Sequence, residues 1–158
     1  MTEREPRHTH IVAKPGSTAI QTTRVFRAPR SRVFEALTRP EHLARWWGPR
    51  SLELVVCEVD LRIGGRYRFV QRAPDGQEFG FCGEYREITP PARIVYTFAF
   101  EAMPEHEALV TITLEERDGE TTLREDTLHG SVEARDAHFA AMEHGARESM
   151  EQLAEVVS

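Results

Sequence analysis

One long helix at the C-terminal end constrains the fold more than any other feature of this sequence. Residues 132–157 contain no proline and one glycine, and apolar side chains recur there at every third or fourth position, as in an amphipathic helix. Ser131 can cap its first turn, where Glu133 and Asp136 suit the positive end of the helix dipole. Such a helix is roughly 40 Å long. Its apolar stripe, which the rest of the chain must bury, consists of Phe139, Met142, Ala146, Met150, Leu153 and Val157.

The middle of the chain predicts an antiparallel sheet. Short segments rich in β-branched and aromatic residues alternate with turn signals, a pattern typical of strands joined by tight hairpins. Gly64-Gly65, Pro74-Asp75-Gly76 and Asp118-Gly119 are such turn signals, and Pro90-Pro91 interrupts the pattern once more. The strands predicted in this way are 52–61, 66–73, 77–88, 92–100, 107–116 and 120–129.

The N-terminal part of the chain predicts a tail, one more strand and two short helices. Residues 1–16 contain two prolines, one glycine and little apolar material, so we expect a flexible tail. Residues 17–28 are rich in Thr, Val, Ile and Phe, which favours a strand. Helices are expected at 30–38 and 39–46, where apolar residues fall on one helical face. Both are short and must pack on the sheet.

Local signals mark the ends of the second short helix. Thr38 and Glu41 have the spacing of a capping box, in which two side chains satisfy free backbone N–H groups of the first turn. Pro40 fits that first turn. Gly48 and Pro49 prevent the helix from continuing.

Composition points to one ordinary globular domain. The chain has 158 residues, of which 40% are apolar and 29% charged, which is too apolar for a disordered chain and too charged for a membrane protein. Its first residues are charged, so no signal peptide is predicted, and we expect no membrane span. Cys57 and Cys82 are too few for a disulfide framework. We therefore expect a cytoplasmic protein.

The sequence lacks the motifs that are typical of several binding and catalytic functions. The net charge is −6 and the basic residues come singly, so nucleic acid is not an expected partner. No phosphate-binding motif follows Gly64-Gly65, and Asp60 and Arg62 beside that turn are expected to form a local ion pair. His8 and His10 in the tail form at most a weak metal site. We expect no metal and no cofactor.

Four stretches carry a resemblance to a known family: FRAPRSRVFEALTRPEHLARWWGP at 26–49, DLRIGGRYRFV at 60–70, APDGQEFGFCGEYREITPPARIVYTF at 73–98 and HGARESMEQLAE at 144–155. The chain resembles the START/SRPBCC superfamily and, within it, the branch named after the activator of the Hsp90 ATPase (AHSA-type). The resemblance implies an α+β helix-grip fold. In that fold a curved antiparallel sheet of seven strands wraps around the long C-terminal helix, and two short helices lie between strands one and two. Residues 17–158 would form this single domain.

One departure from the family pattern concerns the space under the helix. Where the branch usually carries Gly-Trp, this chain has Gly145-Ala146. A methyl group in place of an indole predicts a roomier interior, unless Trp46, Trp47, Phe139 or Met142 moves into the room.

A helix-grip fold can enclose a cavity between sheet and helix, and such concave apolar spaces bind small molecules. Trp46 and Trp47 are expected near its mouth. The alternative is that the same side chains form a packed core. The predicted ligand-binding residues are Trp46, Trp47, Tyr67, Phe69, Phe81, Tyr85, Tyr96, Phe98, Ile112, Leu114, Met142, Ala146 and Met150.

The last strand raises a question about acid–base chemistry. If Leu123 faces inward, then by the two-residue period of a strand Glu125, Thr127 and His129 face inward too. A carboxyl in an apolar cavity has a raised pKa and can act as an acid or base, or hold the polar end of a ligand. The weak catalytic candidates are therefore Glu125 and His129. The alternative is that the strand twists and Glu125 is solvated or paired with an arginine.

Three functions remain open on this sequence. The first is binding of a small hydrophobic molecule. The second is a cyclase- or aromatase-like enzyme, as occurs in the superfamily, using Glu125, His129 and the tyrosines. The third is a chaperone co-factor or other interaction module, although the eukaryotic activators carry an additional domain. A homodimer is a possible assembly.

Overall fold

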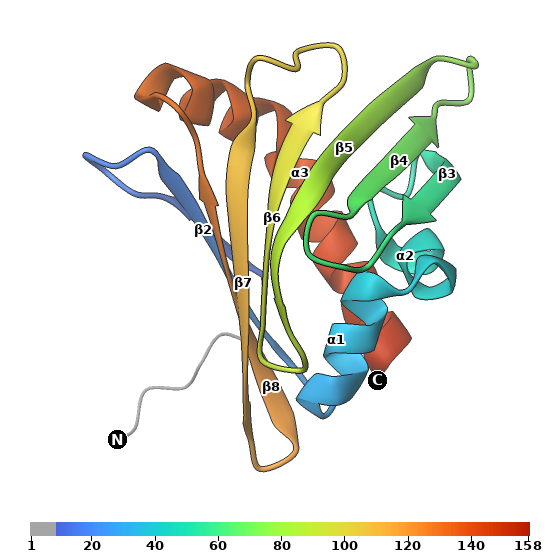
Figure 1. The fold of residues 1–158 in the computed structure, drawn as a ribbon, viewed down its shortest axis with the longest axis vertical. Helices are drawn as coiled ribbons and strands as arrows, with labels where there is room; N and C mark the ends of the chain where they lie inside the picture. The colour runs from blue at the N-terminus through green and yellow to red at the C-terminus, as the bar shows by residue number, and fades with distance from the viewer. Residues whose placement is uncertain (1–8) are drawn as a thin grey trace.

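The computed structural model describes residues 9–158, in which an eight-stranded antiparallel sheet curves around one long helix (Figure 1). The sheet order is β1-β2-β8-β7-β6-β5-β4-β3, so the strands from β3 to β8 follow one another as a meander. This confirms the predicted helix-grip fold. In chain order the elements are β1 (His10–Ala13), β2 (Ala19–Phe26), α1 (Arg30–Thr38), α2 (Pro40–Trp46), β3 (Glu53–Val59), β4 (Arg66–Arg72), β5 (Glu78–Thr89), β6 (Arg93–Phe100), β7 (Ala108–Arg117), β8 (Glu120–Leu128) and α3 (Val132–Val157).

The sheet has one strand more than the sequence predicts. Strand β1 lies within residues 1–16, where we expected a tail, and pairs antiparallel with β2 from His10 opposite Thr23 to Ala13 opposite Ile20. Ile11 is buried, and this apolar contact together with the pairing orders a segment whose own composition is unremarkable. His8 and the rest of residues 1–8 lie outside the described residues.

The helix pair α1–α2 is found where predicted, but its cap is not. Thr38 does not cap α2, because its hydroxyl donates a hydrogen bond to the Phe34 carbonyl oxygen in the turn before (2.8 Å). Arg39 is the N-cap residue of α2 and makes no side-chain capping bond. Residue spacing alone cannot distinguish a hydroxyl that caps the following helix from one that bonds back into the preceding helix.

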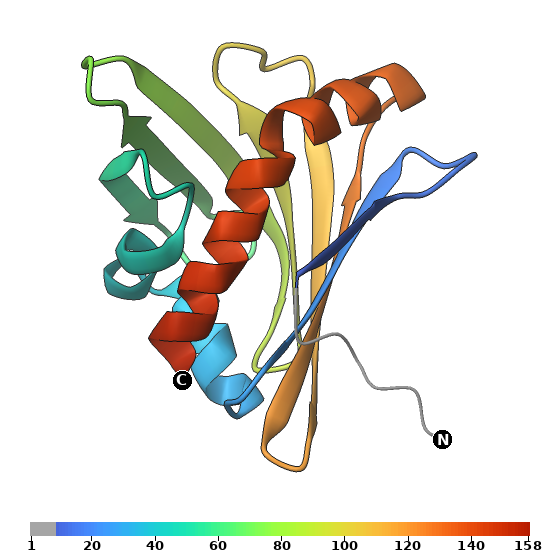
Figure 2. The ribbon, with the colours of Figure 1, turned by 180° about the vertical axis from the view of Figure 1, so that it is seen from behind.

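Helix α3 is held along its two flanks. It packs on β1 and β2 on one side and on α1 and α2 on the other, as the view from behind shows (Figure 2). Its C-terminal half completes the apolar core, where Leu153 and Val157 are almost fully buried. No helix in residues 9–158 combines the length and the hydropathy that a membrane span needs.

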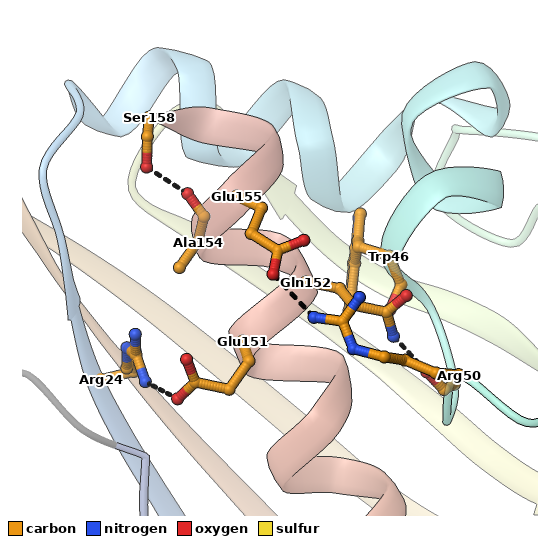
Figure 3. Close-up of polar contacts among 9 residues, drawn as sticks. Arg24, Trp46, Arg50, Glu151, Gln152, Ala154, Glu155 and Ser158 are labelled. Atoms are coloured by element: carbon orange, nitrogen blue, oxygen red, sulfur yellow. Dashed lines mark hydrogen bonds and ion pairs between the residues drawn. The ribbon is translucent and has the colours of Figure 1, made fainter.

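Ion pairs at both flanks fix the C-terminal half of α3 (Figure 3). Arg24 of β2 donates to Glu151 at 2.5 Å, and Arg50, after α2, donates to Glu155 at 2.6 Å. The Arg24 side chain is 9% exposed, whereas both partners of the second pair are more than half exposed. Glu151 is itself 53% exposed, so burial on the Arg24 side alone distinguishes this pair from the exposed one, which stabilises by about 1 kcal/mol at most.

Ser131 caps the first turn of α3, as the sequence predicts. The Ser131 hydroxyl accepts a hydrogen bond from the Ala134 N–H at 3.1 Å. Ser131→Ala should lower the free energy of unfolding by about 1 kcal/mol, because that N–H loses its partner. Urea denaturation measures the change. Ser131→Gly is the matched control and should cost only a few tenths of a kcal/mol; equal losses in both variants would contradict the capping role.

Candidate functional site

A partly open cavity of about 160 Å³ lies between α3, the α1–α2 helices and the concave face of the sheet. Its walls are mainly aromatic and aliphatic. All of the residues predicted to line such a space do so except two. Those in the wall are Trp46, Trp47, Tyr67, Phe69, Tyr85, Tyr96, Phe98, Ile112, Met142, Ala146 and Met150.

Phe81 and Leu114 do not line the cavity, and packing explains both. Phe81 stacks on Phe98 with ring centroids 5.5 Å apart and meets Trp47 edge-on, so other rings take the wall positions. Leu114 pairs with Leu123 across β7 and β8, and both are buried in the core rather than at the cavity. Face alternation predicts that both point inward, but it does not predict where along the strand the cavity ends.

Trp46 is a fixed wall residue rather than a residue of the mouth. It is 5% exposed, and its indole Nε1 donates a hydrogen bond to the Ala36 carbonyl oxygen at 2.7 Å. Trp47 is half-buried and packs against Phe69 with ring centroids 4.9 Å apart. The two indoles therefore shape the end of the cavity that α2 closes.

Gly48 ties the α2 end of the cavity to α3. Its N–H donates to the Ser149 hydroxyl at 2.7 Å, and its carbonyl oxygen accepts from Gln152 at 2.7 Å. Its φ of +93° suits glycine, and a Cβ here would lie 1.5 Å from the Gln71 Nε2 atom. The turn that ends α2 therefore has a structural requirement for glycine, which the sequence shows only as a helix stop.

Ala146, where the family resemblance leads us to expect an indole, is part of the wall. Ala146 lines the cavity from α3, while Gly145 lies against Pro49, whose Cδ would be 3.5 Å from a Cβ at residue 145. Met142 also lines the cavity, but the volume that remains is still about 160 Å³. A cavity is therefore present beside Ala146.

Three tyrosines form an aromatic cluster in the sheet wall. The ring centroids of Tyr67 lie 5.5 Å from those of both Tyr85 and Tyr96. The Tyr67 hydroxyl donates to the Thr97 carbonyl oxygen at 2.6 Å. Burial, as the main cause, raises the pKa of all three hydroxyls above the ordinary value, so they stay neutral and can serve as hydrogen-bond donors.

Glu125 brings a carboxyl to the cavity wall. It lies on β8 between Thr22 of β2 and Ile112 of β7, which line the same cavity. The Thr127 hydroxyl contacts its Oε1 at 3.5 Å. Burial raises the pKa of Glu125 to about 7, and the Thr127 contact only partly opposes this. The inward orientation expected for this residue is therefore found, and no arginine of residues 9–158 pairs with it.

The two histidines near this end of α3 differ in position. His138 lines the cavity, and desolvation together with neighbouring His129 lowers its pKa to about 4. His129 is buried beside it, with ring centroids 4.7 Å apart, but it does not line the cavity. Burial lowers the pKa of His129 as well, so both rings are neutral near pH 7.

Several other residues of the cavity wall were not predicted from the sequence. His138 lies four residues before Met142 on the same helix face, a spacing that could have revealed it. Gly48 and Pro49 come from a turn whose path the sequence does not show. Cys57 and Cys82 are free and half-buried, and neither lines the cavity. The wall residues that were not predicted are Thr22, Leu37, Leu43, Gly48, Pro49, Gln71, Ile94, Val110, His138, Gly145 and Ser149.

Fold and cavity together define a helix-grip domain with an internal, mostly apolar space. The sequence matches the family described as "Activator of Hsp90 ATPase homolog 1-like protein" over residues 27–158, and the chain belongs to this family. No curated protein matches the chain.

Solved structures agree with this assignment. A protein from Chromobacterium violaceum is 33% identical, with 88% of this chain and 96% of that chain covered and a TM-score of 0.77. One from Rhodobacter sphaeroides is 30% identical, with 93% and 95% covered and a TM-score of 0.83. A third, from Mycobacterium smegmatis, shares the fold at 24% identity, with 95% and 96% covered and a TM-score of 0.85.

Proposed function

We propose that this protein binds a small, mainly apolar molecule in the cavity between α3 and the sheet. The observation that carries the proposal is the cavity itself: about 160 Å³, lined mainly by aromatic and aliphatic side chains and bordered by Ala146 of α3. Ligand pockets are typically concave and apolar with a few polar groups. Here Glu125, Thr127 and His138 supply such groups.

The volume limits the ligand to about the size of one substituted ring. Pockets for drug-sized molecules measure about 300–1,000 Å³, whereas apolar cavities of about 150 Å³ bind benzene. A volume of about 160 Å³ is too small to hold a whole sterol or long acyl chain. A monocyclic compound of the size of ethylbenzene fits it.

The energetics favour an occupied cavity. Any part of this space of about 160 Å³ that solvent does not fill costs about 24 cal/mol per Å³. An apolar molecule bound there would recover that cost.

The test is a thermal-shift and native mass spectrometry screen of monocyclic compounds, with ethylbenzene as the first probe. A ligand present at 100 times its Kd stabilises by about 2.7 kcal/mol, which for a chain of this length raises Tm by about 5–10 °C. Sterols and fatty acids are the size controls and should give no shift. Stabilisation by none of the monocyclic compounds would overturn the proposal.

Acid–base catalysis on the bound molecule is a second candidate. The observation in its favour is the pKa of Glu125, which burial raises to about 7, near the value that suits a general acid or base at neutral pH. Native mass spectrometry of the same samples detects acid–base reactions that add or lose atoms, such as a dehydration, because these change the mass of the bound or released compound. A mass change that survives Glu125→Gln would exclude Glu125 as the acid.

A further inference from the structure

We infer that the cavity accepts a small amine, held as its ammonium by the Glu125 carboxylate with its apolar body against the aromatic wall; this rests on the proposed ligand binding. The charge of Glu125 favours an amine. Glu125 faces the cavity, and within residues 9–158 its one hydrogen-bond contact is the long one from Thr127. A buried carboxylate needs a positive partner, and a ligand ammonium can provide it.

Among residues 9–158, no cation contributes to the pKa shift of Glu125. Arg24 of β2 lies on the same face as Thr22, which pairs with Glu125. Its guanidinium is bound to Glu151 at 2.5 Å. Tyr67 of β4 and Tyr96 of β6 lie close enough to feel its charge, and both stay neutral. Asp126, the next residue on β8, is itself acidic and disfavours ionisation of Glu125 further. His138 faces the cavity from α3 and is neutral near pH 7. The charges at the polar end of the cavity therefore favour a cationic ligand.

The aromatic wall supports the same ligand class. Tyr67, Tyr85 and Tyr96 form one cluster with ring centroids 5.5 to 6.2 Å apart, and all three rings line the cavity. The face of an aromatic ring attracts an ammonium group through its quadrupole. A ligand carboxylate would instead meet Glu125 as a like charge, unless the two shared a proton.

The experiment compares probes of nearly equal size. Benzylamine, benzyl alcohol and ethylbenzene have the same number of non-hydrogen atoms and differ in one terminal group, and benzoate adds an anion. At pH 8 benzylamine should bind about tenfold or more tightly than the other three, the strength expected of a charge-assisted hydrogen bond. Titration calorimetry and thermal shift give the affinities.

Two variants assign the effect to the Glu125 carboxylate. Glu125→Gln should weaken benzylamine about tenfold or more and should not weaken ethylbenzene, which has no group for the carboxylate to hold. Asp126→Asn is the matched control, because it removes a carboxylate from the neighbouring position on the same strand. Asp126 accepts a hydrogen bond from Gln21 at 3.3 Å and does not line the cavity, so benzylamine affinity should stay within about twofold.

Measuring benzylamine affinity over a range of pH separates the effect of the Glu125 charge from the effect of the cavity's shape. Benzylamine affinity should rise between about pH 6 and pH 8 as Glu125 gives up its proton, and the profile should be flat for Glu125→Gln. His138 titrates below this range and the tyrosines above it. A falling affinity for benzoate over the same range would fit a protonated Glu125 as donor.

The outcomes separate the two proposals. If ethylbenzene binds and benzylamine binds no more tightly, the amine assignment is overturned while ligand binding stands. If benzoate is the tightest ligand below pH 6 and benzylamine remains weak, the cavity prefers acids and the amine assignment is again overturned. If none of the four probes binds, both proposals fail.

Discussion

Ala146→Trp is expected to abolish binding of ethylbenzene. Ala146 lines the cavity from α3, and an indole placed there would occupy the space that a monocyclic ligand needs. Because filling empty core volume recovers part of its cost of about 24 cal/mol per Å³, we expect Tm without ligand to rise. Ethylbenzene should then produce no further thermal shift.

Two further variants serve as controls for this test. Ala141→Trp makes the same change at an exposed position of α3 and should keep the full thermal shift. If the indole is too large for the site, as overpacking can be, Ala146→Met fills part of the cavity and should give an intermediate loss. A full ethylbenzene shift in a folded Ala146→Trp protein would show that the ligand binds elsewhere.

Glu125→Gln is expected to remove a pH-dependent loss of stability. The pKa of Glu125 rises from 4.5 to about 7 on burial, so between these values the folded protein holds a proton that the unfolded chain has released. Stability from this group is therefore complete below about pH 4.5 and is lost as the pH rises through 7. The full difference corresponds to about 3 kcal/mol, and solvent in the partly open cavity reduces it to about 2 kcal/mol.

Urea denaturation at pH 5 and at pH 8 measures this effect. Wild type and Glu125→Gln should have similar free energies of unfolding at pH 5, and the variant should be about 2 kcal/mol more stable at pH 8. The histidines titrate in both proteins, so their contribution cancels in the difference. Asp126→Asn should keep most of the wild-type pH dependence, because burial is the main cause of the raised Glu125 pKa and the Asp126 charge adds to it only as a lesser cause. Parallel curves for wild type and Glu125→Gln would mean that the carboxyl is solvated.

The fold could be predicted because its signals are local and agree with one another. The predicted helix 132–157 is α3 to the residue, and the Asp118-Gly119 turn has the positive φ angles at both residues that a tight hairpin needs. Strand β1 could not be predicted, since four residues with one buried side chain leave no periodic pattern. Strand β1 is ordered by its pairing with β2, which is a tertiary interaction.

The cavity could be predicted only in outline. Alternation along β4 and β6 identifies Tyr67, Phe69, Tyr96 and Phe98 as inward-facing, and the structure agrees. Which inward residues meet empty space depends on where α3 crosses the sheet, and a sequence holds no direct record of that crossing. Leu114 illustrates the limit, because it faces inward and is simply packed.

The anchoring of α3 along its flanks separates two kinds of residue on one helix. Glu151, Gln152 and Glu155 hold it in place through polar contacts, whereas Met142 and Ala146 face the cavity. Substitutions at 142 and 146 can therefore reshape the interior without loosening the frame. Related proteins that keep the frame could diverge in the compounds they accept by exchanging very few side chains.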